Sequence, residues 1–444
     1  MRHRGGHDRT RRQILKATLV GAGWLAGCHP PMPMTELSGD FPLGVASGDI
    51  TSSSVLVWTR YLRTDPLELI VWKGAPEGAN VVVAQPVVSI EKEGVVRLVV
   101  DDLAPDTRYT FAFYPLIDGQ RGAPSELGNF RTAPAADVAA PLVVAATSCT
   151  RLGYPMTVLE RAAARRDLDL FLMLGDNTYA DDATTLTDYR RYWEATLVEP
   201  GQRALRAALP IISTWDDHEF ENNWSFESID PKRFDAAARA FFEHVPARRD
   251  PVHPERIWRS FRWGKTAEFF VVDSRGERRP STRESASPEY ISRAQMDWLK
   301  AGLSASDAVF KVIVNSVPIA QYGGVLFDRY VADRWEGYPV QRDEILKHID
   351  DNVRGALWIG GDFHLASMGY VSRDGPGKDA IEVLVGPGAN AQNPSPSYPR
   401  PPQFMWASGV NNYTTFSFNP AAREVRVTFF DAGDSILADR TFTL

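Results

Sequence analysis

The sequence is poor in cysteine, with only Cys28 and Cys149 among its 444 residues. If Cys28 carries a lipid, as its surroundings indicate, Cys149 has no partner for an intramolecular disulfide. A lone thiol in an oxidising compartment is oxidised unless it is buried or bound to a metal. Cys149 is therefore a candidate metal ligand.

Three further features are lacking beyond residue 27: an internal repeat, an apolar run long enough to span a bilayer and an excess of basic residues. Without residues 1–27 the chain has 43 basic against 55 acidic residues, a net charge of −12. This balance argues against nucleic acid as the main partner and suits a site that collects cations. The length and the 44% hydrophobic residues predict a globular protein of two or three domains.

Residues 1–27 are typical of a twin-arginine lipoprotein signal peptide. Arg11-Arg12 precedes eleven mostly apolar residues, Ala17 to Gly27, which are too few to span a bilayer. Cys28 follows Leu25-Ala26-Gly27 and would become the acylated first residue. We expect the twin-arginine machinery to export the protein to the periplasm or cell envelope, with a membrane anchor at Cys28. The alternative is a basic, disordered tail.

Residues 28–40 form a proline-rich tether, and residues 41–134 form short alternating strands separated by turn residues. This spacing predicts an all-β sandwich of the fibronectin or immunoglobulin kind. A Pro/Ala-rich linker follows. From residue 141 to 444 buried apolar strands alternate with helices, which predicts an α/β domain with a helical insertion at about 183–260. The chain ends in β-hairpins.

Four apolar strands of this second domain are followed by residues of types that can bind metals. The strand ends are Ser148-Cys149, Gly175-Asp176 with Tyr179 nearby, Trp215-Asp216-Asp217-His218-Glu219, and Gly361-Asp362-Phe363-His364. Open α/β sheets bind ligands outside the carboxyl ends of their strands. A single Gly-Asp after a strand is weak evidence, but four such ends in this order are far more specific. The sequence therefore predicts a shared metal site.

Two metal ions close together require one shared carboxylate and separate ligands for each ion. Asp176 is the candidate for the bridge and Asp217 for the second ion. Asp362 and His364 supply an oxygen and a nitrogen from one strand end. The thiolate and phenolate of Cys149 and Tyr179 favour a ferric or similarly strong Lewis-acid ion, whereas the carboxylates suit Ca²⁺.

These motifs, from Phe41 nearly to the C-terminus, resemble the PhoD-type alkaline phosphatases of the calcineurin-like metallophosphoesterase superfamily. The resemblance implies a two-sheet β core flanked by helices, and an exported phosphomonoesterase and phosphodiesterase with Fe³⁺ and one or two Ca²⁺. It implies that Cys149, Asp176 and Tyr179 bind iron. The remaining ligands that it implies are Asp216 or Asp217, Asp362 and His364.

Further residues are predicted to act on the substrate. His218 is expected to contact a phosphoryl oxygen or the leaving group. Arg275 and Asp273 follow a strand, and an arginine fork matches phosphate oxygens. Weaker candidates are Asn222, Asn223 and Asn315. No base adjoins Ser148 or Thr147, so we expect direct attack by a metal-bound hydroxide without a phosphoenzyme.

The sequence departs from the family at several points. Ser148-Cys149 stands where many members of the superfamily have Asp-x-His, and Asp216-Asp217-His218 replaces Gly-Asn-His. No C-terminal helix that could cap the site is evident, which indicates an open site. A phosphodiesterase or phospholipase D-like preference is one alternative, and a non-catalytic, envelope-anchored binding lipoprotein is another. We expect a monomer.

Overall fold

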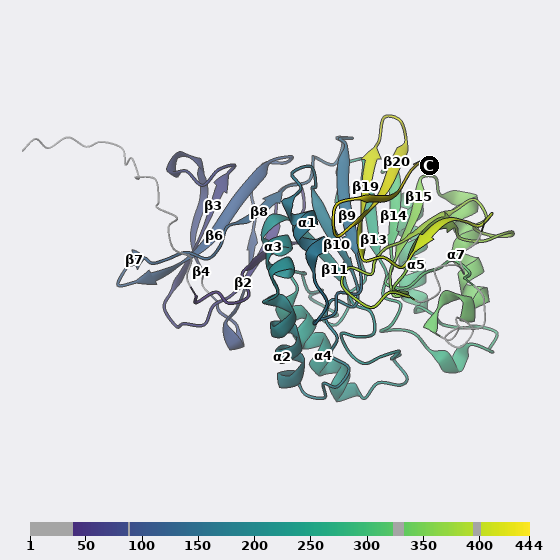
Figure 1. Cartoon of the computed structure of the whole chain (residues 1–444), viewed down its shortest axis with the longest axis horizontal. Coiled ribbons are helices and arrows are strands. Elements are labelled where there is room, and N and C mark those ends of the chain that lie inside the picture. Colours follow the sequence, from purple (N-terminus) through teal and green to yellow (C-terminus); the bar gives the residue numbers. More distant parts are fainter. Residues whose placement is uncertain (1–38, 88, 323–332, 394–400) are drawn as a thin grey trace, which may run out of the picture.

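The computed structural model describes residues 39–87, 89–322, 333–393 and 401–444 (Figure 1). The predicted signal peptide, Cys28 and nearly all of the tether lie outside these ranges. No helix within them has both the length and the apolar character that crossing a membrane requires.

In the described part of the chain, nine strands form the first sheet, in the order β21-β20-β19-β9-β10-β11-β1-β2-β5. Its centre consists of parallel strands that are buried throughout or nearly so, as their continuous apolar sequences require. In spatial order the strands are β21 (Ile436–Thr443), β20 (Glu424–Asp431), β19 (Asn412–Asn419), β9 (Leu142–Thr147), β10 (Leu170–Leu174), β11 (Pro210–Thr214), β1 (Val45–Gly48), β2 (Val55–Arg60) and β5 (Val95–Val100).

Seven strands form the second sheet, whose central strands are also parallel. In spatial order they are β12 (Arg259–Trp263), β13 (Ala267–Val271), β14 (Phe310–Val314), β15 (Ala356–Gly360), β17 (Ile381–Leu384), β16 (Ala366–Tyr370) and β18 (Phe404–Ser408).

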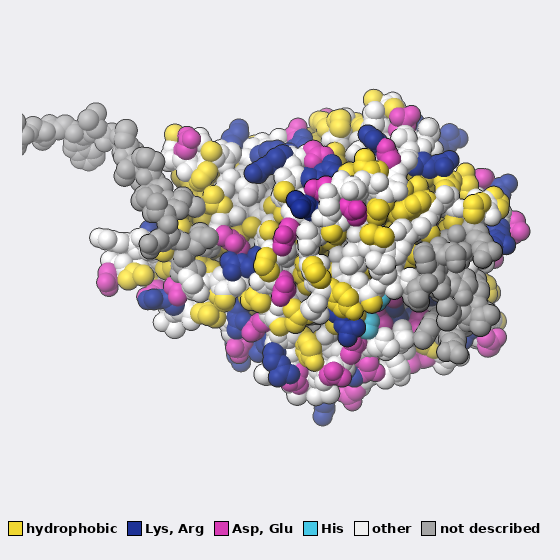
Figure 2. Space-filling model, in the orientation of Figure 1, with side chains coloured by type: hydrophobic (Ala, Val, Ile, Leu, Met, Phe, Trp, Pro, Cys, Tyr) yellow, Lys and Arg dark blue, Asp and Glu magenta, His cyan; other side chains and the backbone are white. Residues whose placement is uncertain are grey.

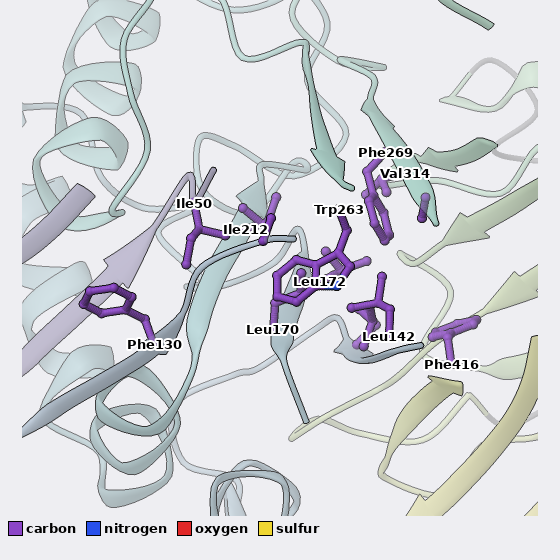
Figure 3. Packing of buried hydrophobic residues seen from close by; sticks show 14 of the residues in the cluster. Ile50, Phe130, Leu142, Leu170, Leu172, Ile212, Trp263, Phe269, Val314 and Phe416 are labelled. Carbon is purple, nitrogen blue, oxygen red and sulfur yellow. The ribbon is translucent and has the colours of Figure 1, made fainter. Parts of the chain in front are cut away.

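The two sheets pack face to face through one apolar core. Leu172 and Ile212 of the first sheet lie in the same buried cluster as Phe269 and Val314 of the second (Figure 3). The rings of Phe269 and Phe418 meet edge to face at 6.2 Å across the two sheets. The predicted two-sheet core flanked by helices is confirmed.

Helices cover the outer faces of both sheets. On the first sheet they are α1 (Thr157–Ala164), α2 (Leu186–Leu197), α3 (Pro200–Ala208) and α4 (Pro231–His244); on the second they are α5 (Arg293–Ala305) and α7 (Pro339–Asn352). Their starts follow from local sequence. Thr185 and Asp188 form a capping box at α2, and the Asp230 side chain caps α4 just before Pro231.

The N-terminal region is all-β but is not separate from the nine-stranded sheet. A third sheet contains β3 (Leu67–Lys73), β4 (Val81–Val87), β6 (Arg108–Ile117), β7 (Gln120–Arg121) and β8 (Gly128–Arg131). The other N-terminal strands, β1, β2 and β5, extend the nine-stranded sheet instead. Ser47 and Gly48 of β1 pair in parallel with Pro210 and Ile211 of β11. The N-terminal region therefore supports the strand that leads to Asp216 and Asp217.

Candidate active site

The four predicted strand ends meet at one place. β9, β10 and β11 are adjacent and parallel, so Cys149, Asp176 and Asp217 emerge at the same edge. β15 of the second sheet brings Asp362 and His364 to them. Among the described residues, three sets of side chains have donor atoms within 4.8 Å of one another: Cys149, Asp176 and His364; Asp176, Asp217 and His218; and Asp216, Asp217 and Asp362. Asp176 and Asp217 each belong to two sets, as carboxylates shared between neighbouring ions would.

Left-handed backbone recurs at these strand ends. The φ angles are 58° at Cys149, 54° at Asp176, 74° at Asp362 and 48° at His364. Such conformations cost non-glycine residues about 1–3 kcal/mol each and cluster at functional sites. Gly175, with φ 86°, is required because a Cβ there would lie 2.5 Å from the Cβ of Asp216.

The first set contains the softer donors. Tyr179 Oη donates a hydrogen bond to Asp176 Oδ2 at 3.1 Å and lies 3.1 Å from His364 Nε2. Asn390, which was not predicted, lies with its amide nitrogen against both Tyr179 Oη and His364 Nε2. It follows β17 in Gly386-Pro387-Gly388-Ala389-Asn390, where the Gly-Pro-Gly turn after a strand was the available signal.

The pKa shifts of these side chains favour a bound cation. Burial raises the pKa of the Cys149 thiol, the Asp176 carboxyl and the Tyr179 phenol well above their ordinary values. Burial lowers the pKa of His364 to about 4, so its imidazole is neutral and able to bind a metal. A multivalent cation supplies the charge that anionic donors need in such a buried place.

Asp217, in the second set, has one carboxylate oxygen that accepts no hydrogen bond from the described residues. Its Oδ2 accepts a hydrogen bond from the Asn223 backbone N–H at 2.7 Å, whereas its buried Oδ1 has no hydrogen-bond partner in the described part of the chain. Burial alone would raise the pKa of Asp217, but Arg275 and His218 hold it well below its ordinary value. An ionised oxygen without a hydrogen-bond donor fits a metal ligand.

Asp216 differs from its neighbour because both of its oxygens are occupied. Arg275 forks onto it, with Nε–Oδ1 at 2.8 Å and Nη2–Oδ2 at 2.9 Å, and Ser316 Oγ donates to Oδ1 at 2.7 Å. Arg275 is 1% exposed and also lies 3.7 Å from Asp217 and 3.6 Å from Asp362. We expected Arg275 to contact phosphate, but the structure places its guanidinium among the carboxylates, where it orients them.

Asp273 was also expected to act on the substrate, and the structure places it elsewhere. Its Oδ1 accepts hydrogen bonds from Trp215 Nε1 and from the backbone N–H groups of Arg275 and Gly276, at 3.0, 3.1 and 2.8 Å. Burial raises its pKa to about 6. It belongs to none of the three donor sets. The physical reason is the sharp turn after β13, which turns this carboxylate back onto its own backbone.

His218 is paired with Asp181, a residue that was not predicted. His218 Nδ1 lies 2.7 and 2.9 Å from the two Asp181 oxygens, and its ring packs on Tyr179 with centroids 4.0 Å apart. Burial would lower the pKa of His218, but Asp176, Asp181 and Asp217 together raise it to about 10. In Figure 2 a histidine side chain is visible at the surface beside acidic and basic groups.

Glu219 ties two strand ends together, a role that was not predicted. Its carboxylate accepts backbone N–H bonds from Asp176 at 3.2 Å, Asn177 at 2.5 Å and Asp216 at 2.9 Å. Burial raises its pKa to about 7. Its place in the Asp-Asp-His-Glu motif was a signal that could have been used.

The remaining candidates are held by backbone atoms. Ser148 Oγ donates to the Val385 carbonyl at 3.0 Å, and Thr147 Oγ1 to the Asn412 carbonyl at 2.9 Å, so neither hydroxyl is prepared as a nucleophile. Asn315 donates to the Val317 carbonyl at 2.7 Å. Asn222 is exposed, and no contact of its side chain with the donor sets is found among the described residues.

Known proteins share both parts of this architecture. The sequence model of the PhoD-like phosphatase family matches residues 142–398, and that of the PhoD-like phosphatase N-terminal domain matches residues 27–134. The chain belongs to the PhoD-like phosphatase family. Alkaline phosphatase D of Bacillus subtilis (strain 168) is 29% identical over 416 residues, which cover 78% of this chain and 70% of that protein.

Solved structures support the same fold. The structure of PhoD matches with a TM-score of 0.77 at 23% identity, over 91% of this PhoD-like chain and 90% of the other. Purple acid phosphatase PPD1 from yellow lupin (Lupinus luteus) seeds matches with a TM-score of 0.64 at 14% identity, over 90% and 73% of the two chains. This PhoD-like phosphatase is thus a phosphoric ester hydrolase, and its donor sets are suited to metal ions.

Proposed function

We propose that this PhoD-like phosphatase is an exported, metal-dependent hydrolase of phosphate mono- and diesters that transfers the phosphoryl group directly to water. The observation that supports it most is the meeting of Cys149, Asp176 and Asp217 from the first sheet with His364 from the second. The engaged hydroxyls of Ser148 and Thr147 argue against a covalent phosphoenzyme.

The donor atoms divide into two kinds. Cys149, Asp176, Tyr179 and His364 offer a sulfur, a carboxylate, a phenol and an imidazole donor, respectively, and this combination suits Fe³⁺. Asp217 and Asp362 offer oxygens alone, which suit Ca²⁺. Ions held at these donors would polarise the phosphoryl group and lower the pKa of water.

The protein's own groups supply orientation and a proton. Asp181 accepts from His218 Nδ1–H, which fixes the ring and leaves Nε2 for the substrate. We propose that His218 donates a proton to the leaving alcohol. Arg275, Ser316 and Glu219 hold the carboxylates and strand ends in place.

Turnover of p-nitrophenyl phosphate and bis(p-nitrophenyl) phosphate, measured together with metal content, tests the proposal. We expect hydrolysis of both esters, loss of turnover on chelation and recovery with added metal. Turnover by metal-free protein would contradict metal dependence. Absence of turnover by metal-loaded protein would favour the non-catalytic binding lipoprotein. Turnover of the diester alone would favour the phosphodiesterase alternative.

Inversion at phosphorus on a chiral ester would support direct attack by water. Net retention would instead require a covalent intermediate and would refute this mechanism.

We also propose export by the twin-arginine machinery and lipid anchoring at Cys28, supported by Arg11-Arg12 and the Leu25-Ala26-Gly27-Cys28 sequence. Replacing Arg11-Arg12 with Lys-Lys should retain the protein in the cytoplasm. Cys28→Ser should abolish incorporation of labelled fatty acid. Unchanged export and unchanged labelling would contradict the two parts separately.

A further inference from the structure

The ring of Tyr179 lies between side chains that come from two neighbouring strand ends. The His218 ring lies with its centroid 4.0 Å from that of Tyr179, and the Arg151 guanidinium carbon lies over Tyr179 at 5.3 Å from its centroid. Arg151 follows β9, Tyr179 follows β10 and His218 follows β11, in the spatial order of the strands. Arg151 and His218, from the strand ends on either side of β10, therefore both lie against the tyrosine ring.

Arg151 carries a charge that is available to a ligand. Its residue is exposed, and its side chain has no ion pair among the residues that the structure describes. Its backbone is fixed, because Arg151 N–H donates to the Ala389 carbonyl at 2.7 Å. Contact with an aromatic face holds a guanidinium and leaves its N–H groups free for an anion. Arg275, by contrast, is buried and bound to Asp216.

The position of Arg151 also indicates which part of a substrate it meets. Tyr179 Oη points to Asp176 and His364, so this end of the ring faces the donor sets. The Arg151 guanidinium lies over the ring, and the residue is exposed. A group bound at Arg151 would lie on the solvent side of the donor sets, where the ester substituent of a phosphate bound at those donors would extend.

We propose that Arg151 determines specificity by binding a negative charge on the part of the substrate that is not transferred. The preferred substrates are then phosphate esters whose alcohol carries a carboxylate or a second phosphate. This inference rests on the proposed function of the site.

The test compares two esters that differ chiefly in this charge, phosphoglycolate and 2-hydroxyethyl phosphate. For Arg151→Ala we expect KM for phosphoglycolate to rise about 3- to 5-fold at low salt, the range for a partly exposed charge pair. KM for 2-hydroxyethyl phosphate and kcat for both esters should stay unchanged. Arg151→Lys should recover part of the preference, and high salt should remove it from the unaltered enzyme.

Arg440→Ala is the matched control, because Arg440 is also exposed and lies over an aromatic ring, that of Phe442, at 5.8 Å on the edge strand β21. It should alter neither KM. An unchanged ratio of the two KM values in Arg151→Ala, with both esters still hydrolysed, would overturn this inference alone. Equal losses for both esters together with lost metal would show that Arg151 only supports Tyr179, and would also overturn it. Failure of the unaltered enzyme to hydrolyse either ester would overturn the proposed function as well.

Discussion

His218 Nδ1 lies 2.7 Å from Oδ1 and 2.9 Å from Oδ2 of Asp181, so one carboxylate fixes the imidazole of the active site. Asp181 is 34% exposed and His218 18% exposed in their side chains, so the pair lies at the edge of the site, within reach of a substrate. This relationship gives the first prediction.

Asp181→Asn should slow the hydrolysis of alkyl phosphates about 10- to 100-fold, because the proton on His218 is less well positioned for the leaving alcohol. p-Nitrophenyl phosphate should be affected much less, since p-nitrophenolate leaves without a proton. Metal content should not change. Asp182→Asn, at the exposed neighbouring residue, is the control. Equal effects on both kinds of ester would exclude this role for the pair.

Cys149→Ala should remove iron and leave the oxygen-bound ion in place. The buried thiol is the only sulfur in the donor sets, and a soft anionic ligand contributes to the selection of iron. Metal analysis of the purified variant measures this directly. Cys28→Ala should retain full iron content. Unchanged iron in Cys149→Ala would show that the thiol only fills space.

Asp216→Asn and Asp217→Asn should differ in kind. Asp216→Asn removes the partner of the buried Arg275 guanidinium and should lower the free energy of unfolding by about 3 kcal/mol. Asp217→Asn should cost less stability and should lower metal content and turnover. Urea unfolding and metal analysis of both variants distinguish the two. The same loss of metal with the same stability in both variants would contradict this division of roles.

His244 should make stability depend on pH. Burial lowers its pKa to about 4, and its Nδ1–H donates to the Ala240 carbonyl at 2.7 Å. Between pH 4 and about 6.5 the unfolded chain therefore binds a proton that the folded protein does not, so stability falls as the pH falls through this range. From pH 7 to pH 5 the loss is about 2 kcal/mol. Urea midpoints at both values measure it.

His244→Phe should reduce that loss, since the ring stacked on Trp193 is kept and the titrating group is removed. His253→Phe, at an exposed histidine, should keep the full dependence. A loss that is the same in His244→Phe and the unaltered protein would assign it to other groups.

The elements with continuous apolar sequences were predicted well from the sequence. After residue 141, buried apolar strands alternate with helices in the structure, as the sequence indicated. α7 was missed because its polar residues, such as Gln341 and Arg342, are buried and bonded in the fold instead of marking a solvent face. β1 was missed because Val45-Ala46-Ser47-Gly48 is short and becomes a strand only by pairing with β11.

The site residues were predictable where a residue of a metal-binding type closely follows a buried strand. The structure brings Cys149, Asp176, Asp217 and His364 together as their positions after strands indicated. Contacts that depend on loop geometry were not predictable. Arg275 follows a strand like the others, yet its orientation toward Asp216 depends on the turn after β13. Asp181 and Asn390 lie in loops, whose conformation cannot be predicted from hydrophobic periodicity.

The parallel pairing of β1 with β11 joins the N-terminal region and the following domain in one sheet. Neither region therefore completes this sheet without the other. A protein cut at the Pro/Ala linker near residue 135 would expose the edge of β11, just before Asp216 and Asp217, and would leave apolar surface of β2 and β5 without its partner. The N-terminal region is therefore a structural part of the nine-stranded sheet, and a shortened protein that keeps this sheet intact has to retain β1, β2 and β5.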